Sequence, residues 1–175
     1  KSYLPHDKIH LGLDLQGGMH LVLEVDTDKA VENSLNRTAG DLKDFLMERK
    51  LRFRAFEIQE GRTISLELPG PEEDEAFRKI LTDSFPNLDI RSSQWSDGRE
   101  TLALGFRPKD ADGIRTFAVE QSLETIRNRI DQFGVTEPEI VPQGTDRILI
   151  QLPGVKDPRR AINLIGKTAL LEFHL

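Results

Sequence analysis

Residues 119 to 154 have the sequence VEQSLETIRNRIDQFGVTEPEIVPQGTDRILIQLPG, which predicts a helix followed by two strands. Apolar residues recur at helical spacing in its first part, and Gly134 is placed to end the helix. The strands are expected near Glu137 to Val141 and at Arg147 to Leu152, with Gly144 in the turn between them. A helix followed by a hairpin is the middle of a βαββαβ unit. The flanking sequence should therefore supply one strand before it and a helix and a strand after it.

The upstream sequence repeats this pattern. VENSL at Val31 to Leu35 echoes VEQSL at Val119 to Leu123, and the LPG that begins at Leu68 echoes the LPG that begins at Leu152. In both halves the order is helix, strand, glycine turn, strand, LPG, helix and strand, which favours a duplication. The predicted fold class is therefore α+β, built from duplicated ferredoxin-like (βαββαβ) α/β-sandwich units whose antiparallel sheets have helices on one face.

The other elements follow from periodicity and turn residues. Asp28 is predicted to cap the helix of the first half, and Asp97-Gly98 is a strong signal for a short hairpin. Met19 to Val25 is expected to be a largely buried strand. The remaining expected elements are strands at Leu51 to Ile58, Arg62 to Leu68, Leu88 to Trp95, Glu100 to Phe106 and Thr168 to Leu175, a helix with Glu72 to Glu75 in its first turn, and a helix starting at Pro158.

The composition indicates a globular chain and excludes several kinds of site. The chain has 175 residues, 37% of them hydrophobic, enough for one core or two small ones. Its 24 basic residues against 30 acidic ones give a net charge of −6, and no polybasic run offers a footprint for nucleic acid or anionic lipid. The absence of cysteine excludes disulfides and thiolate chemistry. No apolar run is long enough for a membrane helix, and a start without methionine indicates a piece of a longer protein.

A glycine-rich segment, LGLDLQGG, occupies Leu11 to Gly18. Phosphate-binding loops follow a strand and open a helix, whereas these glycines precede a strand. Gly12, Gly17 and Gly18 are therefore expected to allow a positive φ or a bulge where the chain enters the sheet. Asp14 is expected to cap a turn through the backbone rather than to act in catalysis. The four histidines have no metal-binding spacing, so neither a metal nor a catalytic site is predicted.

Two blocks of the sequence resemble the signatures of the SecD family of protein-export subunits. The first is LGLDLQGG with the following MHLVLEV, and its motif residues here are Gly12, Asp14, Leu15, Gly17 and Gly18. The second is ETIRNRIDQFGVTEPEIVPQGTDRILIQLPGV from Glu124 to Val155, followed by LIGKTALLEFHL from Leu164 to Leu175. The intervening stretch from about Thr27 to Pro108 carries no recognised motif of that family.

This resemblance implies a non-enzymatic module on the periplasmic side of the bacterial inner membrane. The family's partners would be SecF, the SecYEG channel, a translocating preprotein and the membrane helices of SecD itself. Together these proteins use the proton-motive force to help draw preproteins out of the membrane. The family's proton-carrying residues lie in membrane helices, and its periplasmic region has a mobile head after the LEF strand. The chain is therefore expected to be the base of that region, as a scaffold for the substrate grip or part of it, without a cofactor.

The resemblance also bears on the domain boundaries. The strand at Met19 to Val25 could complete the half that follows it or the more distant half that begins near Asp110. Shorter family members run from the glycine motif almost directly into the later helix, which favours the distant partner. The expected domains are then a discontinuous ferredoxin-like base of residues 1–26 plus 109–175 and an inserted αββαββ unit of residues 27–108. A tandem arrangement is the alternative.

Two groups of residues are candidates for an interaction surface. Arg127, Arg129 and Asp131 lie in the predicted helix, where they would contact another domain or an exported chain, or else form a solvated face with weak salt bridges. The second group is Arg52, Arg54 and Phe56, which alternate onto one face of a predicted strand. The alternative functions are a ferredoxin-like module that binds a small regulatory molecule and, less favoured, an RNA-binding sheet. The acidic charge and scarcity of Trp and Tyr weigh against RNA, so no nucleic-acid partner is expected.

Overall fold

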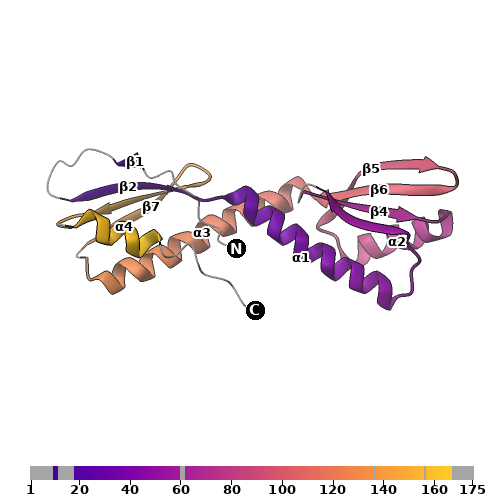
Figure 1. Cartoon of the computed structure of the whole chain (residues 1–175), viewed down its shortest axis with the longest axis horizontal. Helices are drawn as coiled ribbons and strands as arrows, with labels where there is room; N and C mark the ends of the chain where they lie inside the picture. The colour runs from indigo at the N-terminus through magenta and orange to yellow at the C-terminus, as the bar shows by residue number, and fades with distance from the viewer. Residues whose placement is uncertain (1–9, 12–17, 60–61, 136, 156, 167–175) are drawn as a thin grey trace. The chain divides into compact units, whose positions relative to one another are not determined.

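The computed structural model describes residues 10–11, 18–59, 62–135, 137–155 and 157–166, and Figure 1 shows their arrangement along the chain. The elements are β1 (His10–Leu11), β2 (Met19–Glu24), α1 (Thr27–Glu48), β3 (Ala55–Gln59), β4 (Thr63–Leu68), α2 (Pro71–Ser84), β5 (Leu88–Ser96), β6 (Arg99–Phe106), α3 (Pro108–Phe133), β7 (Glu139–Gln143), β8 (Arg147–Leu152) and α4 (Pro158–Gly166). The strands form two four-stranded antiparallel sheets, which confirms the predicted α+β class.

Contacts between Cα atoms divide the chain into two compact units. Residues 1–30 and 114–175 form one, called here the terminal unit, and residues 31–113 form the other, called the middle unit. The strand order is β1-β2-β8-β7 in the terminal unit and β3-β4-β6-β5 in the middle unit. Both orders are compatible with ferredoxin-like sheets, in which the hairpin's second strand lies next to the strand from the other end of the unit. The duplication and the proposed domain boundaries stay predictions.

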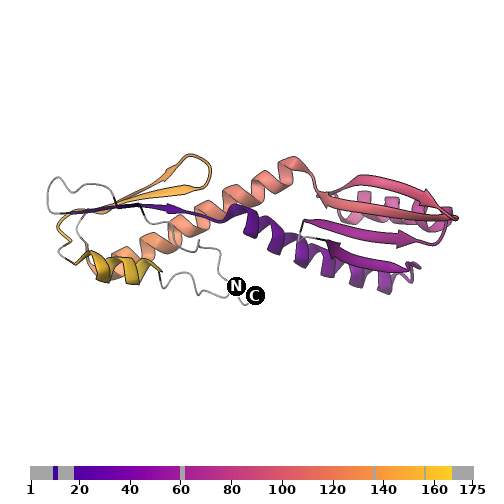
Figure 2. The ribbon, with the colours of Figure 1, turned by 45° about the horizontal axis from the view of Figure 1, so that its top comes forward.

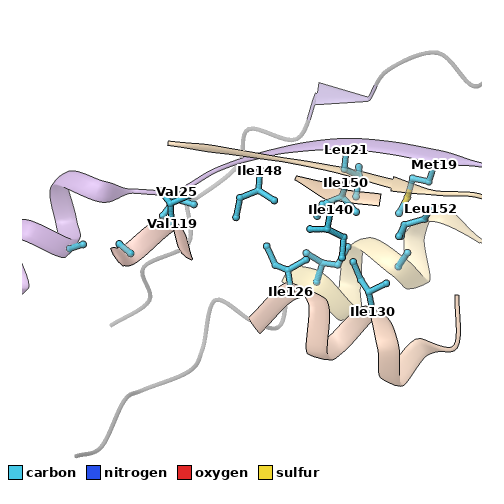
Figure 3. Close-up of a cluster of buried hydrophobic side chains, with 14 residues drawn as sticks. Met19, Leu21, Val25, Val119, Ile126, Ile130, Ile140, Ile148, Ile150 and Leu152 are labelled. Atoms are coloured by element: carbon cyan, nitrogen blue, oxygen red, sulfur yellow. The ribbon is translucent and has the colours of Figure 1, made fainter. Parts of the chain in front are cut away.

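The terminal unit is built around β2 and β8. Met19 to Glu24 pair with Leu152 to Arg147 in antiparallel register, so the early strand joins the more distant half of the sequence. Figure 3 shows apolar side chains of this sheet meeting those of α3, with Ile126 and Ile130 facing Ile140 and Ile150. The buried cluster consists of Met19, Leu21, Val25, Ala30, Ala118, Val119, Ile126, Ile130, Ile140, Ile148, Ile150, Leu152, Ala161 and Ile165.

The middle unit shows strict alternation along its central strands. Ile64, Leu66 and Leu68 of β4 are buried, whereas the residues between them are partly exposed. The buried face is covered by α1 and α2, and Figure 2 shows the four strands side by side. The predicted hairpin between β5 and β6 closes through Asp97 and Gly98, whose φ values of 51° and 72° are those of a type I′ turn.

The structure differs from the sequence-based expectation at the start of β3. The strand was predicted from Leu51, but β3 begins at Ala55 because the preceding residues cap α1. Lys50 has a φ of 56°, and the Leu51 N–H donates to the Leu46 carbonyl at 3.0 Å, which is the long hydrogen bond of a Schellman cap. A lysine in the left-handed position gives no sequence signal, since glycine is the usual residue there.

Two smaller differences concern other element ends. The cap of α1 is Asp26 and not Asp28, because the Lys29 N–H donates to the Asp26 carboxylate at 2.9 Å. The strand predicted from Glu137 begins at Glu139, since Glu137 has a φ of 53° that no extended strand adopts. The strand predicted at residues 168–175 lies outside the described residues.

Candidate functional site

Gly18 joins the two sequence blocks that carry the family resemblance. A Cβ atom at this position would lie 2.9 Å from the carbonyl oxygen of Leu152 and 3.1 Å from the Cα of Pro153. Both are backbone atoms, so they cannot rotate away. Met19, the next residue, pairs with Leu152 at the start of β2. Gly18 is therefore needed for close approach of the glycine motif to the LPG segment. It does not have the positive φ that was one of the two roles expected for it.

The first residue of the glycine motif is also placed beside the same strand. His10 and Leu11 form β1, which pairs with Val22 and Leu21 of β2. The motif residues Gly12, Asp14, Leu15 and Gly17 lie outside the described residues, so their predicted structural roles stay predictions. The two described ends of the motif therefore both lie beside β2: Leu11 pairs with it from the edge strand β1, and Gly18 immediately precedes its first residue.

The candidate residues on α3 do not form a single patch. Arg127 is exposed, and its Nη2 donates to the carbonyl oxygen of Ile140 at 3.3 Å, which links α3 to β7. Asp131 is exposed one helical turn later, on the same side as Arg127. Arg129, two positions from each, is half-buried on another side of the helix and has interactions of its own. Arg127 and Asp131 are thus available at the surface, and Arg127 also helps to hold the sheet against the helix.

The second candidate group lies in the middle unit and is not a strand face. Arg52 precedes β3 and forms an ion pair with Glu73 of α2, whose side chain is only 11% exposed. Phe56 is half-buried, with its ring edge-on to Phe53 at a centroid distance of 6.0 Å. Arg52 and Arg54 both present exposed side chains, and the Arg54 backbone N–H donates to the Glu67 carbonyl at 2.8 Å. The predicted strand face is therefore wrong, because Arg52 and Arg54 precede β3 and only Phe56 lies within it.

An open sheet edge, which the sequence did not single out, is present in β5. This strand lies at the end of its sheet and pairs only with β6 among the described strands. Its register shifts between Ile90 and Ser92, and regular pairing resumes from Ser92 to Ser96. Ser92 to Ser96 is exposed and carries no charged side chain, and Trp95 within it is 51% exposed. Exposed edges without charge or proline can accept a further strand.

A buried carboxyl group was also missed. Glu100 of β6 is 0% exposed, and its Oε1 accepts hydrogen bonds from Arg78 Nη2 at 2.8 Å and from Ser93 Oγ at 2.5 Å. Arg78 also donates through Nε to Asp74 at 2.6 Å. Glu100, Asp74, Arg78 and Ser93 are called the Glu100 cluster below. Oε2 of Glu100 is buried and has no hydrogen-bond partner in the described structure.

The electrostatics of the Glu100 cluster favour a neutral carboxylic acid. Burial is the largest effect and raises the pKa of Glu100 above its ordinary value, and the neighbouring Asp74 raises the pKa further. The Ser93 hydroxyl and the Arg78 guanidinium act in the opposite direction without reversing the shift. Strand parity could have found this residue, because Glu100 shares the inward positions of Leu102 and Leu104.

Both ends of the chain match models of known protein families. Residues 119–175 match the family described as "Protein translocase subunit SecDF, P1 domain, N-terminal". Residues 3–29 match the "SecD/SecF GG Motif". The chain belongs to the SecD family. The matched GG-motif segment contains Gly18, and the matched P1 segment contains Leu152 and Pro153, so the two segments meet at the close approach described above.

Curated SecD proteins are similar over nearly the whole chain, including the middle unit. "Protein translocase subunit SecD" of Syntrophobacter fumaroxidans is 49% identical over 99% of this chain and 33% of its own length. The proteins of the same name from Desulfurispirillum indicum and Pseudomonas aeruginosa are 44% and 37% identical, over 97% and 94% of this chain and 32% and 26% of their own lengths. The chain thus spans about a third or less of these relatives. The RNA-binding and small-molecule alternatives are not favoured.

The residues that the structure describes contain no helix with both the length and the apolar character needed to cross a membrane. They also contain no group of three or more His, Cys, Asp or Glu side chains arranged to hold a metal ion.

Proposed function

We propose that this chain is a non-catalytic module on the periplasmic side of the inner membrane, in a SecD subunit that assists preprotein translocation. The observation that carries the proposal is the similarity to proteins named as SecD over nearly the full chain. Family membership supports a role in the Sec protein translocation machinery. The whole subunit would act with SecF beside the SecYEG channel and draw on the proton-motive force through membrane helices that precede and follow this chain.

Within the module, residues 1–26 plus 109–175 would be the base and residues 27–108 the inserted unit. The packing of the terminal unit supports the first role. Its buried cluster joins β2, from the glycine-motif block, to β8 and α3, from the second block. A base that transmits force needs a packed core between segments far apart in the sequence, because close-packed interiors transmit strain.

Direct contact with a translocating chain would occur at the edge of β5, from Ser92 to Ser96. An extended polypeptide can add to a sheet edge through backbone hydrogen bonds, which tolerate any side-chain sequence. The other edges of the described sheets are less suitable, because β1 has only 2 residues, β7 contains Pro142 and β3 exposes Glu57. The exposed Trp95 adds an apolar contact beside the β5 edge. Weak and sequence-tolerant binding is the expected behaviour.

The requirement for this module in export can be tested with a buried and a surface substitution on the same strand. Cells would carry as their only copy the full-length subunit with Ile150→Asp, which places a charge at a fully buried position of β8. Gln151→Asp places the same charge on the half-buried neighbour and serves as the control. We expect uncleaved preprotein to accumulate with Ile150→Asp only. Normal export by an Ile150→Asp subunit present at wild-type level would contradict the proposal.

The β5 edge can be tested separately with Gln94→Lys. A lysine on an edge strand opposes the addition of another strand. Thr101 is the register partner of Gln94, is equally exposed and lies on the inner strand β6, so Thr101→Lys is the matched control. Slower export with Gln94→Lys and unchanged export with Thr101→Lys would support edge binding. Equal rates for the two variants would remove the edge from the mechanism while leaving the role in export intact.

A further inference from the structure

The Glu100 cluster is the most unusual group of ionisable side chains in the described residues, and the proposed role in export does not use it. An ionised carboxylate can only accept hydrogen bonds, and it has room for about four. Both donors that reach Glu100 bind Oε1, so an ionised Glu100 leaves Oε2 buried without a donor. A buried charge of this kind is strongly disfavoured unless every polar atom is satisfied.

The charges of the cluster point in the same direction. Two carboxyl groups, Asp74 and Glu100, share one guanidinium, that of Arg78. The fully ionised cluster therefore has one excess negative charge, and of its members Glu100 is the one that is fully buried, whereas Asp74 is 18% and Arg78 44% exposed. A single proton removes that excess and turns Oε2 from an unsatisfied acceptor into a donor. The carboxylate of Asp74, whose interaction with Glu100 favours the protonated acid, is the available acceptor.

We propose that the Glu100 cluster is a buried binding site for one proton, which is held on the Glu100 carboxyl. The ligand is a proton rather than a metal ion for two reasons. Arg78 already occupies the cationic position beside Oε1 at 2.8 Å. In addition, the described residues include no third carboxylate or histidine that would complete a metal site with Asp74 and Glu100.

Among the described residues, the titratable groups that act on Glu100 are Asp74 and Arg78. From α2 it faces Asp74 and Arg78, and from β5 it faces Ser93. Its register partners are Trp95 of β5 and Leu68 of β4. Another ion pair of this sheet, Arg99 with Glu67 at 3.5 Å, consists of residues at the opposite parity and hence on the other face.

Proton binding at this place links pH to the contact between α2 and the β5–β6 hairpin. Because the pKa of Glu100 is raised in the folded chain, protonation contributes stability that is fully present below the ordinary value of 4.5. This contribution is lost as the pH rises through the raised pKa. Above that pH the ionised carboxylate favours an opening of the hairpin that lets water reach Oε2. Acidification should therefore tighten the end of β5, and alkalinisation should loosen it.

The fluorescence of Trp95 can report the binding of this proton. Trp95 is the only tryptophan, and it is the register partner of Glu100. We would titrate the fluorescence of the 175-residue chain over the pH range in which it is folded. The expected result is one transition with a midpoint above 4.5, which is lost in Glu100→Gln because an amide does not ionise. Glu67→Gln, the same change on the other face of the sheet, should keep the transition.

Two variants that retain Glu100 should shift the midpoint in opposite directions. Asp74→Asn removes the charge that raises the pKa of Glu100 and should lower the midpoint. Ser93→Ala removes a hydrogen bond that lowers the pKa and should raise the midpoint. These variants decide the matter if Glu100→Gln does not fold. A wild-type signal that is constant with pH, a transition that survives in folded Glu100→Gln, or unshifted midpoints in both other variants would overturn the proposal.

Discussion

Replacing Gly18 with alanine should destabilise the terminal unit although the change adds only a methyl group. The new Cβ would lie 2.9 Å from the Leu152 carbonyl oxygen and 3.1 Å from the Pro153 Cα, so the backbone of β2 or β8 must move. Such overpacking costs about 1 to 3 kcal/mol. The lower entropy of the unfolded alanine chain returns about 0.4 to 1 kcal/mol. The two ranges leave a net loss centred on about 1.3 kcal/mol, which should raise the fraction of open molecules about tenfold.

Hydrogen exchange measured by mass spectrometry is suited to this prediction because it reports each unit separately. We expect faster exchange in peptides that cover β2 and β8. Gly40→Ala is the control, since Gly40 lies within α1 and a Cβ there meets nothing within 4 Å. That change should stabilise α1 by about 0.5 to 1 kcal/mol and leave β2 and β8 unaffected. Unchanged or slower exchange of β2 and β8 in Gly18→Ala would refute the argument from close approach.

Three further predictions can be checked by chemical denaturation. Gly98→Ala should lower the free energy of unfolding by about 1 to 2 kcal/mol, because Gly98 has a φ of 72°. A loss below about 0.3 kcal/mol would argue against the I′ turn. Arg52→Ala should cost about 1 kcal/mol more than Arg54→Ala, since only Arg52 pairs with the buried Glu73, and equal losses would contradict that role. Ile126→Ala should cost about 2 to 5 kcal/mol, measured by circular dichroism because the tryptophan lies in the other unit, and a loss under about 1 kcal/mol would place Ile126 outside the core.

The sequence predicts most elements of this fold because their signals are local. Alternation identifies β4, β6 and β8, and the Asp97-Gly98 pair identifies the hairpin turn, since each signal depends on residues close together in the chain. The α+β class follows from the order of these elements. The pairing of β2 with β8 could not be chosen from periodicity, because it joins residues more than a hundred positions apart, and only the family resemblance favoured it.

The misses have physical causes. Lys50 takes the left-handed cap position of α1, so β3 begins later than predicted. For this reason Arg52, Arg54 and Phe56 do not share a strand face. Arg52 also forms a long-range ion pair with Glu73, although its side chain stays 76% exposed. Periodicity detects neither effect, because a lysine is an unusual residue at a left-handed cap and the ion pair joins Arg52 to a residue of α2.

Glu100 illustrates a different limit. A charged residue at an inward strand position can be found from parity, but parity does not reveal what it meets. Its partners come from α2 and β5, so the unsatisfied oxygen and the shared guanidinium appear only when the unit is folded. The sequence therefore predicts strand β6, but it does not reveal which groups contact Glu100.

Site-specific photo-cross-linking in the intact membrane protein, during arrested export of a secretory preprotein, tests the central claim most directly. Probes would be placed at Gln94 on the β5 edge, at Arg127 on α3 and, as the inner-strand control, at Thr101. The account predicts cross-links from Gln94 to the preprotein, cross-links from Arg127 to a subunit of the export machinery or to the preprotein, and none to the preprotein from Thr101. Absence of cross-links to the preprotein and to every Sec component from both Gln94 and Arg127 would contradict it.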